Sequence, residues 1–227
     1  MSAGAVLVHG AFHGPWCWER VGAHLDAAGV RWLAPELYRD SFDDDVAAIT
    51  DAIDELRSDG PVLVAGHSQG GAHITALRAD QVDRLVYVTA IMADAEAGGP
   101  TDPAGGIDPA FFSVMRAEGD TMYLDLDGVA EVFYNTCSPA DAAWATSLLR
   151  PQPSRGSLLA EDPAWRQVPT TYVVCEQDRI LTPDYQRRCA ALVERTVVLD
   201  TDHSPMLCAP AELAAVLSAD LASLDGR

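Results

Sequence analysis

The fold is decided by the stretch Val62-Leu63-Val64-Ala65-Gly66-His67-Ser68-Gln69-Gly70. Its first four apolar residues predict a short buried strand, and the alanine-rich residues that follow predict a helix from Ser68 to Arg78. Glycines two residues before and two after Ser68 allow the chain to turn tightly without Cβ clashes. A serine on a strand-to-helix turn of this kind is typical of a nucleophile elbow, which lifts the hydroxyl out of the sheet. The alternative is a chance match in a chain with 17 glycines.

Strand and helix patterns alternate on both sides of this stretch. Such alternation predicts an α/β protein whose mostly parallel sheet of about six strands is doubly wound, with helices on both faces. We expect strands at residues 5–8, 30–34, 62–65, 82–88, 170–175 and 196–199, and helices at 18–28, 46–57, 68–78 and 210–224.

The alternation stops at about Ala93, where residues 98–106 have the glycine- and proline-rich composition of loops. We therefore expect a core of residues 1–92 and 166–227, with a cap of residues 93–165 inserted after the fourth core strand. This insertion carries more large apolar side chains than a surface segment normally exposes to water. We therefore expect part of it to line a pocket above Ser68. The apolar residues are Phe111, Phe112, Met115, Met122, Tyr123, Leu124, Phe133, Tyr134, Trp144 and Leu148.

The first predicted strand ends in a glycine-containing loop, His9-Gly10-Ala11-Phe12-His13-Gly14. Backbone N–H groups in such a loop can face a substrate carbonyl oxygen and form an oxyanion hole with the N–H of the residue after the nucleophile. We predict donors from the region of Ala11 and Phe12 and from Gln69. Each donor is expected to lower the barrier by about 3 kcal/mol.

A serine nucleophile needs a base and an acid, and position in the chain selects them. His203 follows the last predicted strand and precedes a C-terminal helix, where the chain order serine, acid, histidine of α/β-hydrolases places the base. Asp178 comes three residues after the strand ending at Cys175, so we predict that its carboxylate orients His203. Asp94, Asp200 and Asp202 are alternative acids. Structural roles are expected for His24, His67 and His73, and either structural or pocket-lining roles for His9 and His13.

Five segments together resemble the methylesterase and hydroxynitrile lyase group of α/β-hydrolases over almost the whole chain. The resemblance implies a cap over the site, Ser68, Asp178 and His203 as a catalytic triad, and Ala11 and Gln69 as oxyanion-hole donors. The segments are residues 7–18 (LVHGAFHGPWCW), 66–71 (GHSQGG), 133–137 (FYNTC), Gln177-Asp178 with Tyr185-Gln186, and 202–207 (DHSPML).

The chain departs from the lyase branch of this group at two positions. Those lyases are similar to esterases but carry a threonine in the oxyanion loop and a lysine after the catalytic histidine, where this chain has Gly10 and Ser204. The chain contains no lysine, since all 15 basic residues are arginine. Cyanohydrin cleavage is therefore disfavoured, and Schiff-base chemistry and a P-loop lysine are excluded.

Composition restricts the partners. A formal net charge of −19 disfavours nucleic acid and anionic membrane surfaces and favours neutral substrates. Five dispersed cysteines predict free thiols in a reducing cytoplasm, and without a C-x-x-C pair we expect no metal and no cofactor. No run of eighteen apolar residues and no secretory signal pattern is present, so we expect a cytoplasmic protein. Abundant alanine, aspartate and arginine are typical of a GC-rich bacterial genome.

These observations predict a serine hydrolase that cleaves a small, largely apolar carboxylic ester through an acyl-enzyme. One alternative is a biosynthetic hydrolase that acts on a C–C or amide bond with the same triad, and another is a ligand-binding receptor on a hydrolase scaffold. A homodimer formed through the cap is compatible with the sequence. The residues expected to bind substrate are Phe12, His13, Tyr123, Phe133, Trp144 and Met206.

Overall fold

A computed structural model describes residues 2–92, 101–103, 105–154 and 162–224. Its centre is a six-stranded sheet with the order β2-β1-β3-β4-β8-β9, in which every neighbouring pair is parallel. The predicted α/β fold with about six core strands is confirmed. The strands are β1 (Gly4–Val8), β2 (Trp32–Leu33), β3 (Val62–His67), β4 (Arg84–Val88), β8 (Thr170–Cys175) and β9 (Arg195–Leu199).

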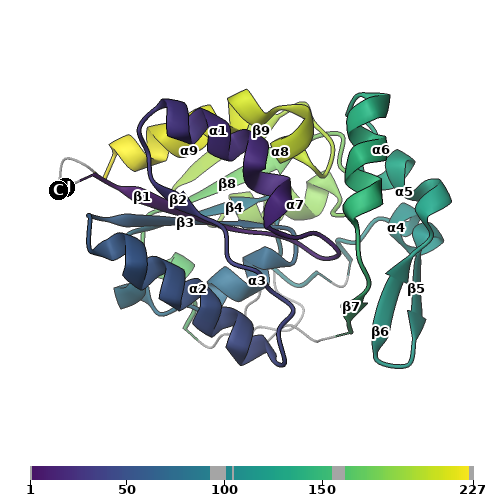
Figure 1. Cartoon of the computed structure of the whole chain (residues 1–227), viewed down its shortest axis with the longest axis horizontal. Coiled ribbons are helices and arrows are strands. Elements are labelled where there is room, and N and C mark those ends of the chain that lie inside the picture. The colour runs from purple at the N-terminus through teal and green to yellow at the C-terminus, as the bar shows by residue number, and fades with distance from the viewer. Residues whose placement is uncertain (1, 93–100, 104, 155–161, 225–227) are drawn as a thin grey trace.

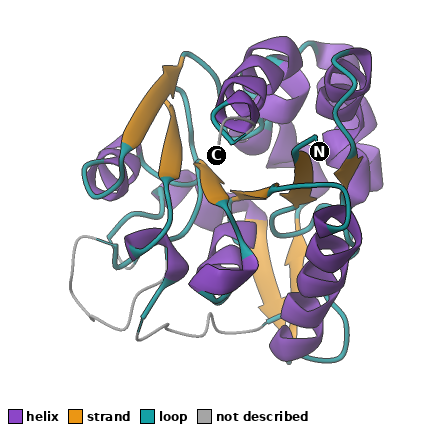
Figure 2. Cartoon of the chain, turned by 90° about the vertical axis from the view of Figure 1, so that its left-hand side faces the viewer, coloured by secondary structure: helices purple, strands orange, loops and turns teal. Residues whose placement is uncertain are grey.

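Helices cover both faces of this sheet, which Figure 2 shows end-on. On one face, α1 (Glu19–Ala27) packs against α9 (Pro210–Ala222), and the short η1 (Pro15–Trp18) and α8 (Pro205–Cys208) extend this layer. The other face is covered by α2 (Phe42–Arg57), α3 (Gly70–Thr75) and α7 (Pro183–Ala190). Figure 1 shows α1 and α9 above the sheet and α2 and α3 below it. Two buried apolar clusters result, one on each face.

Two predicted elements are only about half as long as expected. The strand expected at 30–34 is only Trp32–Leu33, because its pairing with β1 extends over two residues. The helix expected at 68–78 is Gly70–Thr75, followed by the separate turn η2 (Ala79–Gln81). After Thr75 the backbone tightens to i→i−3 bonds, from Ala76 to His73 and from Leu77 to Ile74, which end the helix.

Residues 93–165, which lie between β4 and β8 and are here called the insert, form a second sheet and three α-helices within their described part. Its three strands are antiparallel in the order β5-β6-β7, and Figure 1 shows them with α4, α5 and α6 beside the core, on its right. The elements are α4 (Pro109–Val114), β5 (Met115–Glu118), β6 (Thr121–Leu124), α5 (Leu126–Phe133), α6 (Pro139–Leu148), β7 (Gln152–Pro153) and η3 (Ala164–Arg166).

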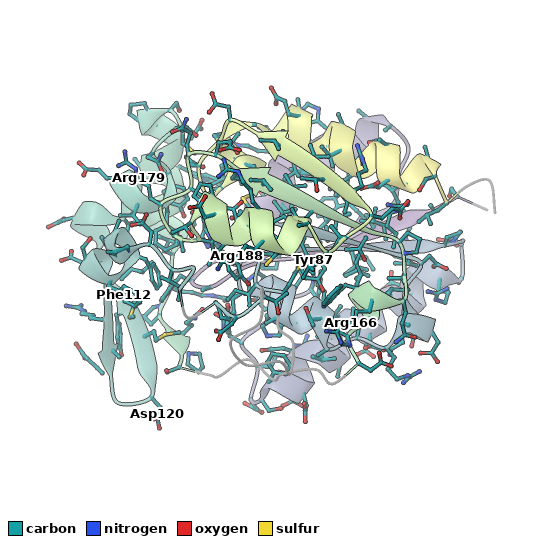
Figure 3. All side chains as sticks on the ribbon, turned by 180° about the vertical axis from the view of Figure 1, so that it is seen from behind. Tyr87, Phe112, Asp120, Arg166, Arg179 and Arg188 are labelled. Atoms are coloured by element: carbon teal, nitrogen blue, oxygen red, sulfur yellow. The ribbon has the colours of Figure 1, made fainter. Side chains whose placement is uncertain are left out.

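Burial within the insert is uneven. Phe133 and Tyr134 are buried as expected, at 2% exposure each. Phe112 is 55% exposed, however, and Figure 3 shows it at the outer side of the insert. Trp144 and Leu148 on α6 are also exposed, although Trp144 packs edge-on against Trp16 of the core. The expectation that the apolar bulk of this segment is hidden from water therefore holds only in part.

Candidate active site

The predicted catalytic residues follow the carboxyl ends of neighbouring parallel strands. Ser68 follows β3, Asp178 lies three residues after β8, and His203 lies four residues after β9. Because β3, β4, β8 and β9 are parallel and adjacent, their carboxyl ends meet at one edge of the sheet. Figure 1 shows the insert next to this edge.

Ser68 has the backbone conformation of a nucleophile elbow. Its φ is +52°, in the left-handed region that a residue with a side chain rarely adopts. The turn is so tight that a Cβ at Gly66 would lie 2.9 Å from the carbonyl oxygen of Gly70. Ser68 is 8% exposed, and its side chain forms no hydrogen bond within the described part of the chain, so its hydroxyl is free to react.

His203 is paired with Asp178. Its Nδ1 lies 2.7 Å from Asp178 Oδ2, and both side chains are buried. A carboxylate oxygen can only accept, so Nδ1 carries the proton and Nε2 has a free lone pair. The carbonyl of His203 lies 2.7 Å from Nε2 of His67, and the two rings are 4.7 Å apart, which sets His203 beside the elbow. The structure has no hydrogen bond between Ser68 and His203.

Asp178 is surrounded by donors that hold it in position. Its Oδ1 accepts the N–H groups of Ile180 at 2.6 Å and Leu181 at 3.0 Å. Its Oδ2 accepts Gln186 Nε2 at 3.1 Å and the Thr89 hydroxyl in addition to His203. Thr89 was not predicted from the sequence; it follows β4 directly and has a φ of +37°. A left-handed φ is strained for a β-branched residue, and the hydroxyl of this strained residue is the one that donates to Asp178.

The three alternative acids differ in placement. Asp94 lies outside the described residues. Asp200 accepts a surface hydrogen bond from Gln177 at 2.8 Å. Asp202 accepts the N–H groups of Ser204 and Thr136, both at 2.8 Å, and its own N–H donates to the Thr136 hydroxyl. Asp202 therefore ties the His203 loop to the insert.

The loop after β1 approaches the elbow closely. A Cβ at Gly10 would lie 2.7 Å from that of Ser68, so only glycine fits there without a shift. Phe12 has a φ of +63°, and its N–H donates to Oε1 of Gln152 in the insert at 2.7 Å. The N–H groups of Ala11 and Gln69 have no acceptor among the described residues. Of the two predicted loop donors, the N–H of Ala11 is therefore available to a substrate oxygen, whereas the N–H of Phe12 is already bound to Gln152.

A cavity of about 150 Å³ opens at Ser68. Apolar side chains from the core loops and the insert form most of its wall, which suits a small apolar ligand. The insert contributes Ile107, Phe111, Met122 and Gln152, and the remaining lining residues are Ala11, Phe12, Ser68, Gln69, Ile91, Ile180 and Leu181.

Of the six predicted substrate-binding residues, only Phe12 lines this cavity. Tyr123 lines a separate cavity, whose other lining residues also belong to the insert. Phe133 stands edge-on to the His203 ring, with 6.1 Å between ring centres, and Trp144 packs against Trp16. Met206 is fully buried in the core.

The sixth, His13, is buried and forms hydrogen bonds to the loop after β1 and to the insert. Its Nδ1 donates to the carbonyl of Ala11 at 2.7 Å, so its Nε2 accepts from the Tyr134 hydroxyl at 2.9 Å. Burial lowers the pKa of His13 to about 3, and burial also lowers the pKa of His67 well below its usual value. Both rings are therefore neutral at pH 7.

Comparison with known proteins places the chain in a family. The model described as "Alpha/beta hydrolase family" matches residues 5–216, so the chain belongs to that family. It is 30% identical to Methylesterase 2 of Arabidopsis thaliana, over 90% of each chain. It is 28% identical to Salicylic acid-binding protein 2 of Nicotiana tabacum, over 93% of this chain and 94% of that one. A pyrethroid hydrolase from Sphingobium faniae has the same fold, with a TM-score of 0.82 at 21% identity over the full length of both chains.

Further findings bear on the remaining predictions. All five cysteines are free thiols. Among the described residues, no helix is long and apolar enough to cross a membrane. One group there has side chains close enough to share a metal ion, namely Cys137, Asp202 and Cys208. The hydrogen bonds of Asp202 already account for its position in the fold. The cytoplasmic location and bacterial source stay predictions.

Proposed function

We propose that this protein is a serine esterase in which Ser68 attacks the carbonyl of a small, largely apolar carboxylic ester. The observation that carries the proposal is the His203–Asp178 pair beside the elbow. It fixes the histidine as the tautomer that can take a proton at Nε2, while the Ser68 hydroxyl has no competing partner in the described part of the chain. The missing Ser68–His203 bond does not count against it, because catalytic hydrogen bonds often tighten only when substrate binds.

In this mechanism Ser68 Oγ forms a bond to the ester carbonyl carbon and His203 Nε2 takes the hydroxyl proton. The carbonyl oxygen becomes an oxyanion that accepts the N–H groups of Ala11 and Gln69. When the tetrahedral intermediate collapses, the bond to the alkoxy group breaks and His203 protonates the departing alcohol. A water molecule then repeats the sequence on the acyl-enzyme, releasing the carboxylic acid and restoring the Ser68 hydroxyl.

We propose esters of short alcohols, methyl esters in particular, as the substrate class. The small apolar cavity and the net charge of −19 favour an uncharged ligand. Several curated relatives carry the name methylesterase, and another is named Methyl jasmonate esterase 1. We further propose that the insert, residues 93–165, acts as a cap, because four of its residues wall the cavity and Ile107 forms a strand bridge to Leu181 beside Asp178.

A panel of methyl and p-nitrophenyl esters tests this proposal. We expect turnover of uncharged esters by the native protein, and a loss of at least about a thousandfold in Ser68→Ala with ligand binding retained. Ser58→Ala, on an exposed serine, is the matched control and should keep full activity. Full activity in Ser68→Ala would overturn the mechanism. Inactivity toward all esters with a reactive Ser68 would favour cleavage of a C–C or amide bond, and a single slow turnover with tight product binding would favour a receptor.

A further inference from the structure

Gln152 is the one insert residue whose polar side chain reaches both loops of the proposed oxyanion hole, as far as the described residues extend. It begins β7, the two-residue edge strand of the insert's sheet, where it pairs with Met122 of β6. Its side chain is 1% exposed and lines the cavity at Ser68. A buried primary amide in a mostly apolar wall is costly unless its hydrogen-bonding groups are paired, so its contacts matter.

The orientation of this amide is fixed by its neighbours. The N–H of Phe12 can only donate, so the atom 2.7 Å from it must be the amide oxygen, Oε1. Nε2 then faces the side-chain oxygen of Gln69, 3.1 Å away, and donates to it. The Tyr38 hydroxyl donates to the same Gln69 oxygen at 3.4 Å. One side chain of the insert thus joins the loop after β1 to the elbow after β3.

The backbone around Gln152 strengthens this attachment. The N–H of Arg150 donates to the carbonyl of Phe12 at 3.1 Å, so the N–H and C=O of Phe12 are both held by residues 150–152. Phe12 has a left-handed φ of +63°. A residue in that conformation persists only where its surroundings hold it, and here the insert does so.

We propose that Gln152 is a positioning residue for the oxyanion hole. By binding the N–H of Phe12 it keeps that group out of the hole, and by holding both loops it sets the distance between the Ala11 and Gln69 N–H groups. This inference depends on the proposed esterase function. Catalysis by such donors depends on their placement before the reaction, so the effect should appear in kcat rather than in substrate binding.

Gln152→Leu tests the inference, because leucine nearly keeps the volume and removes both hydrogen bonds. We expect kcat to fall about 10- to 100-fold while KM changes less than about threefold. Affinity for a trifluoromethyl ketone, whose adduct with the serine places an oxyanion in the hole, should fall by a similar factor to kcat/KM. Thr170→Val is the control for lost buried hydrogen bonds, since the Thr170 hydroxyl bonds to the Val168 carbonyl at the opposite end of the sheet. That variant should lose stability and keep its kcat.

Gln152→Glu provides a second readout that a purely structural role would not change. Its carboxylate still accepts from Phe12 but repels the Gln69 oxygen, whereas the protonated acid can donate to it. The ratio of variant to native kcat should therefore rise as the pH falls through the pKa of the introduced carboxyl. An unchanged kcat in Gln152→Leu, or a flat ratio in Gln152→Glu, would overturn this inference while the native esterase activity stands. If the native protein hydrolyses no ester, the proposed function fails and this inference fails with it.

Discussion

The two halves of the candidate site differ in how far the protein satisfies their polar groups. In the acid–base half, Asp178 accepts from five donors, among them His203, and the pair is buried. In the nucleophile half, neither the Ser68 hydroxyl nor the N–H groups of Ala11 and Gln69 have partners within the described residues.

This difference separates the polar groups whose hydrogen bonds are satisfied within the protein from those left open for a substrate. Asp178 is not expected to touch substrate, so its hydrogen bonds can be permanent and can fix His203. In the proposed mechanism the nucleophile and the oxyanion donors must contact a substrate, so their hydrogen-bonding groups have to be left without partners in the protein. Mutations in the acid–base half should therefore displace His203. Mutations in the nucleophile half should remove a group that the proposed mechanism uses on the substrate.

The largest expected effect in the acid–base half is that of Asp178→Asn. An amide at this position can present its NH₂ to His203 and favour the wrong tautomer, so we expect kcat to fall about 10³- to 10⁴-fold in a folded protein. Asp200→Asn, on the exposed alternative acid, is the matched control and should keep nearly full activity. Steady-state kinetics with a p-nitrophenyl ester measures both. The reverse order of effects would move the acid from Asp178 to Asp200.

A smaller effect is expected at Thr89, which supplies one of the five hydrogen bonds to Asp178. Thr89→Val keeps the shape and removes the donor, so we expect kcat to fall about tenfold because four donors remain. Thr89→Ser keeps the hydroxyl and should recover most of the activity. If the two variants are equally active, the bond contributes nothing to catalysis.

The smallest effect on activity is expected at His13, which bonds to Ala11 of the nucleophile half and whose charge acts on stability instead. The pKa of His13 is about 3 in the folded protein and near 6.5 when unfolded, so the unfolded chain binds the extra proton between these values. Stability should therefore fall as the pH drops from about 6.5 to about 3, with His13 contributing up to about 1.4 kcal/mol per pH unit. Urea unfolding of His13→Gln should show a shallower pH dependence. His24→Gln, at an exposed position, should leave the slope unchanged, and an unchanged slope in His13→Gln would refute the assignment.

The parts of the site that follow from local sequence were predictable. The elbow is encoded by glycine spacing around Ser68, and chain order after two predicted strands singled out His203 and Asp178, which the structure brings into contact. Alternating patterns likewise predicted the sheet. The length of β2 was overestimated because strand length depends on the partner strand, which the pattern does not contain.

The cavity wall was not predictable, because it depends on how the insert folds onto the core. Aromatic size suggested Tyr123 and Trp144, yet both lie away from the cavity at Ser68, while Ile107 and Met122 line it. Gln152 lies between two prolines on a two-residue strand and gave no signal in the sequence. Its position is evident only from its hydrogen bonds to Phe12 and Gln69, which lie 140 and 83 positions away in the chain.

The central claim, that Ser68 becomes acylated while His203 removes its proton, is tested most directly by trapping the intermediate. A p-nitrophenyl ester can be mixed with the native protein, quenched in acid within milliseconds and examined by peptide mass spectrometry. The account predicts one acyl group on the peptide containing Ser68 and none in Ser68→Ala. Rapid turnover with Ser68 unmodified, or an acyl group on another residue that forms and decays at the rate of turnover, would contradict it.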